Sequence, residues 1–175
     1  MEEKEALALL LDRRSIRKYS GEKIARETLI KLVEAGMYAP SAHNQQPWHF
    51  IIMDDPAIFH RILAFHPYSR MIKEAAAVIL TAGNRQHMKS EEFWPQDLAA
   101  ATENILLAAE ALGLGAVWLG VYPRESVMER LTELCRLPEH ILPFSLISLG
   151  YPVEKPQRPN RFQEERFDFN LWREK

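Results

Sequence analysis

Cysteine is almost absent from this sequence of 175 residues, Cys135 being the single example. One thiol cannot make an internal disulfide framework, nor a zinc or iron–sulfur site built from several cysteines. This usage is typical of a reducing compartment, so we expect a cytoplasmic protein. Long hydrophobic runs are lacking too, since no stretch approaches the ~20 apolar residues that cross a membrane. The apolar residues 6–11 follow acidic residues, unlike the basic start of a signal peptide.

An excess of either charge is also missing. Lysine and arginine number 22, aspartate and glutamate 24, and the formal net charge is -2. Such a chain has no overall field to attract nucleic acid or an anionic membrane, so recognition of an anion must come from a local cluster. The six histidines lack the spacing of metal ligands, and we expect no metal site. The length and the 47% of hydrophobic residues predict one globular domain over residues 1–175.

The hydrophobic pattern predicts alternating helices and strands. Helices are expected at 6–11, 26–36, 58–65, 97–112 and 124–135, and strands at 48–53, 75–83, 115–120 and 144–150. The second strand is apolar on both faces, which places it in mid-sheet, and the alanine-rich fourth helix should be buried on most sides. After residue 150, prolines open an extended tail rich in aromatic residues. On its own this alternation would favour a doubly wound parallel sheet.

The densest local charge lies in "RRSIRKYSG", residues 13–21. Cations at the end of an amphipathic helix are often a solvated face that complements the helix dipole. In an extended segment, however, Arg13, Ser15 and Arg17 would project from the same face. Two guanidinium groups with a hydroxyl between them are typical of a phosphate site. The residues alone leave both interpretations open.

A second candidate site is the loop "PSAHNQQPW", residues 40–48. Two prolines stiffen it, and Ser41, Asn44 and Gln46 supply neutral hydrogen-bond donors and acceptors. An ordinary surface turn would use the same residue types. Uncharged donors suit the polar edge of a heterocycle better than they suit a phosphate.

The two stretches together resemble the nitroreductase-like flavin enzymes. The resemblance includes "ALGLGAVWLGVYP" and "LGYPVEKPQRPNR", so that four motifs occur in order over residues 13–161. It implies an α+β fold, with a central, mostly antiparallel sheet flanked by helices, in an intertwined homodimer that holds FMN between its subunits. The tail, residues 150–175, would pack on the partner subunit, and packing on its own subunit is the alternative.

The resemblance also assigns cofactor-binding roles. The basic segment would hold the phosphate and ribityl chain, and Arg158 or Arg161 would complete the phosphate site. The loop of the partner chain would meet the flavin, and the end of the 115–120 strand would lie against its ring. The full set implied for FMN is Arg13, Arg14, Ser15, Arg17, Pro40, Ser41, Asn44, Gln46, Trp118, Leu119, Gly120, Arg158 and Arg161.

The implied activity is that of an FMN-dependent NAD(P)H oxidoreductase with ping-pong kinetics. NADH or NADPH would pass a hydride to the flavin N5, and a nitroaromatic, a quinone or a similar electron-poor small molecule would then accept it. The cofactor would carry the chemistry without a catalytic side chain, while Arg17 or Arg14 would stabilise negative charge near N1 and O2.

Three aromatic residues are candidate substrate contacts, namely Tyr68, Phe93 and Trp94. For the last two, a hydrophobic plug between loop and core is the alternative. Two further interpretations of the whole chain also remain. It could be a flavin- or nucleotide-binding module without turnover, or a specialised relative of the dehalogenase, flavin destructase or azoline oxidase type.

Overall fold

The computed structural model describes residues 3–173. Its helices are α1 (Glu3–Asp12), α2 (Arg26–Met37), α3 (Pro56–Leu63), α4 (Trp94–Ala111) and α5 (Glu125–Cys135), and its strands are β1 (Trp48–Met53), β2 (Ala77–Asn84), β3 (Gly115–Gly120) and β4 (Ile141–Gly150). Among the helices described, none is both long and apolar enough to cross a membrane.

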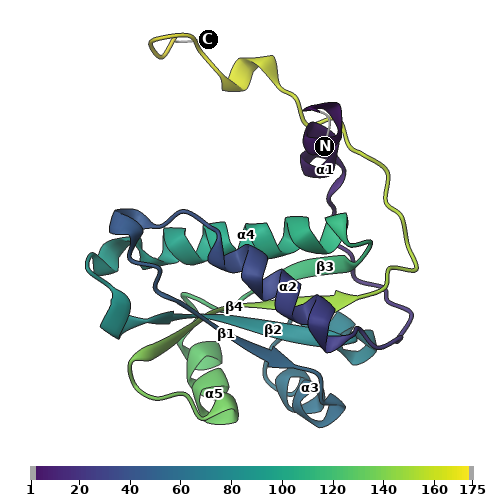
Figure 1. Ribbon diagram of the computed structural model, residues 1–175, viewed down its shortest axis with the longest axis vertical. Helices are drawn as coiled ribbons and strands as arrows, with labels where there is room; N and C mark the ends of the chain where they lie inside the picture. Colours follow the sequence, from purple (N-terminus) through teal and green to yellow (C-terminus); the bar gives the residue numbers. More distant parts are fainter. Residues whose placement is uncertain (1–2, 174–175) are drawn as a thin grey trace.

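The four strands form one sheet in the order β1-β2-β4-β3, and every neighbouring pair is antiparallel (Figure 1). The mid-sheet position predicted for β2 is confirmed, because β1 and β4 flank it. The antiparallel sheet implied by the resemblance is confirmed as well, and the doubly wound parallel alternative is wrong. A helix separates β1 from β2 and β3 from β4, but each of these connections returns the chain in the opposite direction, which hydrophobic periodicity cannot reveal.

Helices cover both faces of the sheet (Figure 1). α2 and α4 pack on one face and α3 and α5 on the other, and β2 feeds both cores, with Ile79 on one side and Val78 and Leu80 on the other. This two-sided burial explains its continuous apolar run. From Asp97 to Glu110 no residue of α4 is exposed, so the predicted burial of this helix is confirmed.

Several element boundaries differ from the sequence prediction by one to three residues, and two of them have a clear local cause. α3 begins at Pro56 because the Asp55 carboxylate accepts a hydrogen bond from the Ala57 N–H at 2.8 Å, which caps the helix. β4 begins at Ile141, three residues earlier than predicted. Pro143 is tolerated inside it because it lies opposite Ala82, where the register of the pairing shifts and a missing N–H costs little.

The tail leaves the body of the molecule beside α1 (Figure 1). Its beginning is tied down, since the Val153 N–H donates to the Lys18 carbonyl at 3.2 Å. Farther along, three phenylalanines contact one another, with ring centroids 5.8 Å apart for Phe162 and Phe167 and 6.0 Å apart for Phe167 and Phe169. All three are exposed. Packing of this tail on a partner subunit stays a prediction.

Candidate functional site

The basic segment, residues 13–21, runs along the free edge of β3. Ser15 pairs with Ala116 in a parallel bridge, and the Ile16 N–H donates to the Ala116 carbonyl at 2.9 Å. Ile16 is buried, while Ser15 and Arg17 on either side of it are exposed. The segment is therefore extended with alternating faces, which is the conformation that the phosphate-site interpretation required.

Tyr19 anchors this segment to the sheet. Its hydroxyl lies 2.7 Å from the Ile16 carbonyl oxygen and 3.2 Å from that of Ser148, and it donates to them from a buried position. Burial raises the pKa of Tyr19 to about 12, so the donor proton is retained at any physiological pH. The ring packs directly on Gly150, where an added Cβ would lie only 2.7 Å from it. The basic segment therefore contains the residue that attaches it to the sheet.

A cavity of about 430 Å³ gathers four arginines, Arg13, Arg14, Arg158 and Arg161. Arg158 and Arg161, the two candidates for completing the phosphate site, therefore line the same cavity but differ in their ion pairing. The Arg158 Nε lies 2.7 Å from an Asp12 carboxylate oxygen, and this guanidinium lowers the pKa of Asp12. No carboxylate in the described chain lies within ion-pair distance of Arg161. Arg161 is thus the more available donor to an anion.

Carboxylates and carbonyls hold the other arginines of the segment. The Arg13 Nε lies 3.0 Å from a Glu103 oxygen on α4. Arg14 donates to the carbonyls of Arg13 at 2.6 Å and Gln157 at 3.4 Å, which ties the tail to the segment. Among the described residues 3–173, the guanidinium of Arg17 donates only to the carbonyl of Ser15, at 3.3 Å.

A second cavity, of about 570 Å³, lies beside Arg17 in the middle of the basic segment. Arg17, Tyr68 and the end of β3 line it, including Trp118, Leu119 and Gly120. A Cβ added at Gly120 would meet no atom within 4 Å, so the backbone is open to a flat ring. By contrast, a Cβ at Gly115 would lie 2.6 Å from Ile16.

His66 fixes the position of Gly120. Its Nε2 lies 3.0 Å from the Gly120 carbonyl oxygen, and because a carbonyl only accepts, Nε2 carries the hydrogen. The other ring nitrogen, Nδ1, is buried and has no hydrogen-bond partner in residues 3–173. Burial lowers the pKa of His66, and the positive charge of Arg124 adds to this lowering. A neutral imidazole therefore holds the strand end.

Two buried polar side chains, Asp97 and Gln45, hold the 40–46 loop in place. The sequence analysis did not identify them. Asp97 accepts from the Ala42 N–H at 2.9 Å and from the Gln45 side-chain amide at 2.6 Å. The side-chain oxygen of Gln45, Oε1, accepts the backbone N–H groups of Lys89 at 2.9 Å and Ser90 at 3.0 Å. The sequence did contain a signal for Asp97, because an aspartate in a buried helix requires hydrogen-bond partners.

The predicted polar side chains of this loop form a small network at the surface. The Ser41 hydroxyl accepts from the Gln46 N–H at 3.0 Å, and the Gln46 amide donates to the Asn44 side chain at 2.9 Å. Three residues have positive φ, His43 at 52°, Asn44 at 50° and Gln46 at 48°. Side chains other than glycine adopt this conformation at a cost of about 1 kcal/mol or more, and such strain clusters at functional sites.

The sequence matches the Nitroreductase family over residues 10–91 and 62–151. The chain belongs to this family. It is 42% identical, over 96% of its length and 88% of the relative's, to a Methanothermobacter thermautotrophicus protein provisionally named NADH dehydrogenase/NAD(P)H nitroreductase.

Solved structures agree with this assignment. One is a Clostridium acetobutylicum protein that is provisionally named NADH oxidase. It has a TM-score of 0.90 and 42% identity, and the match covers 94% of this chain and 99% of that one. Another is a Desulfovibrio desulfuricans protein in complex with FMN that is provisionally named nitroreductase. It has a TM-score of 0.78 and 32% identity, and the match covers 95% of this chain and 100% of that one. The nitroreductase fold is therefore shown.

In this nitroreductase-family chain the two candidate sites attach to different faces of α4. The 40–46 loop is bound through Asp97, and the basic segment through Glu103. Six residues separate these positions, which corresponds to about 9 Å along the helix axis and about 120° around it. None of the three cavities lined by the basic segment includes a residue of the loop. One chain therefore presents the two predicted halves separately.

The aromatic substrate candidates of the nitroreductase-family chain have different environments. Trp94 is 6% exposed and packs edge-on against Tyr122 and Phe144, with centroids 4.8 and 5.7 Å away. This packing favours the hydrophobic plug for Trp94. Phe93 and Tyr68 are exposed, and only Tyr68 lines the cavity at Gly120.

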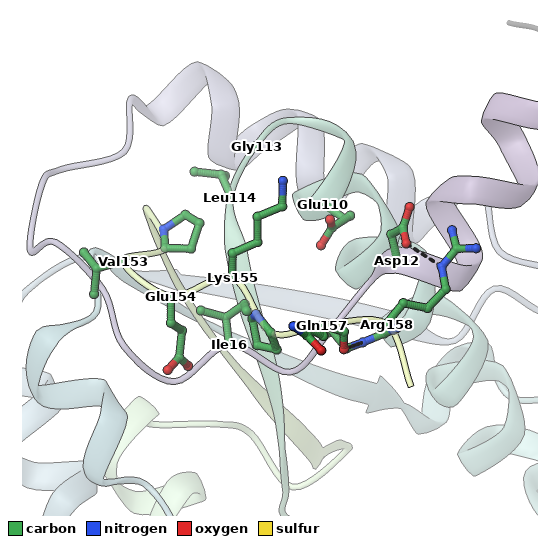
Figure 2. A pocket seen from close by; sticks show the side chains of 13 residues that line it. Asp12, Ile16, Glu110, Gly113, Leu114, Val153, Glu154, Lys155, Gln157 and Arg158 are labelled. Carbon is green, nitrogen blue, oxygen red and sulfur yellow. Dashed lines mark hydrogen bonds and ion pairs between the residues drawn. The ribbon is translucent and has the colours of Figure 1, made fainter. Parts of the chain in front are cut away.

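A further hollow, of about 880 Å³, lies between the start of the tail and the end of α4 (Figure 2). Figure 2 shows Asp12 and Arg158 joined at one end of it. Both signs of charge line it, including Glu110 and Lys155. Mixed charges favour no single class of ligand, and the hollow exists because the tail arches away from the helix.

Proposed function

We propose that two copies of this chain hold FMN between them and catalyse the NAD(P)H-dependent reduction of a small electron-poor acceptor. The observation that carries the proposal is the basic segment along β3. Four arginines gather at its beginning, and beside Arg17 the β3 backbone at Gly120 is open to a flat ring. Arg13 and Arg17 are about 13 Å apart in an extended chain, which suits a ligand with a phosphate at one end and a ring at the other.

The residues present fit FMN. Arg161 and Arg13, supported by Arg14 and Arg158, would bind the phosphate, and Ser15 would contact the ribityl chain. Trp118, Leu119 and Gly120 would lie against the ring. Pro40, Ser41, Asn44 and Gln46 of the second copy would supply its remaining polar contacts, because the loop of the same chain attaches elsewhere on α4.

When bound, FMN supplies hydride transfer at its N5 between reduced nicotinamide and the acceptor. The chain's own contribution is electrostatic and positional. Arg17, whose guanidinium has no carboxylate partner in residues 3–173, would stabilise negative charge at the ring edge. His66 holds the Gly120 carbonyl in place from behind.

A second copy is supported by apolar side chains that one chain leaves in water. Leu7, Leu10 and Leu11 of α1 and the aromatic end of the tail are exposed, Trp172 by 86%. Exposed apolar surface of this extent marks interaction sites. The relatives' names support the cofactors and the donor, FMN for one and NAD(P)H for another.

The test begins with FMN and riboflavin titrations of the purified chain. FMN should bind more tightly, and Arg161→Gln should weaken FMN by about 10-fold or more while leaving riboflavin unchanged, because one charge-assisted bond is worth about 1.5–3 kcal/mol. Arg26→Gln, which alters an exposed pair with Asp54, is the matched control.

Anaerobic addition of NADH or NADPH to the flavin-loaded protein tests turnover. Bleaching of the yellow absorption, with recovery on addition of a quinone, supports the oxidoreductase. A flavin band that stays unchanged would instead identify a binding module without turnover. A chain that retains no FMN, or a holoprotein that is strictly monomeric by light scattering, would refute the shared site.

A further inference from the structure

A carboxylate at the start of the tail contacts the backbone of the basic segment. We propose that Glu154 is a positioning residue, which fixes the backbone of Arg17 so that its guanidinium faces the cavity at Gly120, and which thereby favours the reduced form of the bound flavin. This inference rests on the proposed function. It assigns a role to a residue that lines neither of the two cavities given to the flavin.

The start of the tail and the basic segment run side by side as a short antiparallel pair. Tyr19 pairs with Pro152 in an antiparallel bridge, and the Val153 N–H donates to the Lys18 carbonyl at 3.2 Å. Glu154 is the next residue of the tail. Its side chain continues the pairing by one more residue of the basic segment, so the tail holds that segment beyond the reach of its own backbone.

The Glu154 carboxylate holds Arg17 without neutralising its charge. One oxygen, Oε1, accepts the backbone N–H of Arg17 at 3.1 Å, and the other, Oε2, lies 3.7 Å from the Lys18 ammonium. The guanidinium of Arg17 is outside ion-pair distance of every carboxylate in residues 3–173, and Arg17 lines the cavity at Gly120. The backbone of Arg17 is therefore fixed while its charge stays available to a ligand.

The contact has the properties of a specific bond rather than of a loose surface pair. The Glu154 side chain is only 28% exposed, and a hydrogen bond to a charged acceptor is about twice as strong as a neutral one. Figure 2 shows Lys155, the next residue, pointing to the opposite side of the tail. Because the direction of a side chain follows from its own backbone, the loss of this bond would release the Arg17 guanidinium from the cavity.

Two substitutions of Glu154 form a matched comparison, because Glu154→Gln and Glu154→Ala both remove the charge but only glutamine keeps an oxygen that can accept the Arg17 N–H. The affinities for oxidised and for reduced FMN are measured anaerobically. Relative to Glu154→Gln, Glu154→Ala should lower the affinity for reduced FMN about fivefold more than that for oxidised FMN, which corresponds to a reduction potential about 20 mV lower for a two-electron couple. Lys18→Gln removes the ion pair and keeps the hydrogen bond, so it should change this ratio by less than about twofold.

Equal ratios for the two Glu154 variants would overturn the proposal, because the carboxylate would then act through its charge alone. An equally large change for Lys18→Gln would overturn it as well.

Hydrogen exchange of the apoprotein, followed by NMR, gives a readout that needs no flavin. The Arg17 amide should exchange about fivefold faster in Glu154→Ala than in Glu154→Gln, and equal exchange rates would overturn the proposal. A wild-type chain that binds no FMN would refute the proposed function and with it the effect on the flavin. The exchange rates would still decide whether Glu154 holds Arg17, so the two failures are distinguishable.

Discussion

Replacing Asp97 with asparagine should detach the 40–46 loop from α4. Asp97 is 4% exposed and accepts two hydrogen bonds, from the Ala42 N–H and from the Gln45 amide. Asparagine has nearly the same shape but only one accepting oxygen, so its NH2 group must face one of these donors. Gln45 cannot turn around to help, because its own oxygen accepts the N–H groups of Lys89 and Ser90.

The expected cost follows from these contacts. Each hydrogen bond to a charged group is worth about 1.5–3 kcal/mol, and asparagine keeps one neutral bond worth about 1 kcal/mol. The net loss is therefore about 2–5 kcal/mol. For a chain of this size, each kcal/mol lowers Tm by about 3 °C, so thermal unfolding of the apoprotein at fixed concentration should shift down by roughly 6–15 °C.

A matched control is Asp54→Asn, which removes the same charge from an exposed pair with Arg26 at 3.2 Å. Its effect should stay within about 1 kcal/mol. Asp97→Asn should also weaken FMN binding, because the loop that it releases is proposed to contact the flavin of the second copy. The reasoning would be refuted by a Tm within 1 °C of wild type, or by an equal decrease for the control.

Two other substitutions test the framework of the site. Tyr19→Phe removes the hydroxyl that holds the Ile16 carbonyl at 2.7 Å, so the free energy of unfolding should fall by about 1–3 kcal/mol and the FMN Kd should rise; a lower Tm with unchanged Kd would limit Tyr19 to a stabilising role. For His66, burial lowers the pKa in the folded state below its ordinary value of 6.5. The unfolded chain therefore binds the proton more readily, and stability should decrease as the pH falls below about 6.5. Urea denaturation at pH 7.5 and 5.5 should show a smaller decrease for His66→Gln than for wild type, and equal decreases would contradict the assignment.

Local patterns predicted the strands well, since the bounds of β1 and β3 agree with the structure to the residue. The direction of the strands was accessible only through the family motifs. An alternation of helix and strand is compatible with either direction, because the path of each connection depends on tertiary packing. The start of β4 could not be predicted either, since Pro143 is acceptable only opposite the register shift at Ala82.

Residues that would contact a ligand are easier to recognise in a sequence than the residues that hold those contacts in position. Clustered arginines and a polar loop between prolines are local patterns, and they indicated the candidate site. Gln45, His66 and Asp97 act across long sequence separations, for example 52 residues from Gln45 to Asp97 and 54 from His66 to Gly120. Only the fold brings such pairs together, so a sequence pattern can indicate that a buried residue such as Asp97 needs a partner but cannot identify that partner.

The strain in the 40–46 loop is coherent with this division of roles. Three left-handed residues cost the folded chain several kcal/mol, and an isolated surface turn would gain nothing from them. The buried Asp97 and Gln45 offset that cost, and they hold the loop in one conformation before any ligand arrives. A preorganised loop loses little entropy on binding, so its uncharged donors can contribute affinity that a flexible loop would spend on ordering. Such an arrangement agrees with the proposed function, in which the loop would meet a rigid flavin ring held by a second chain.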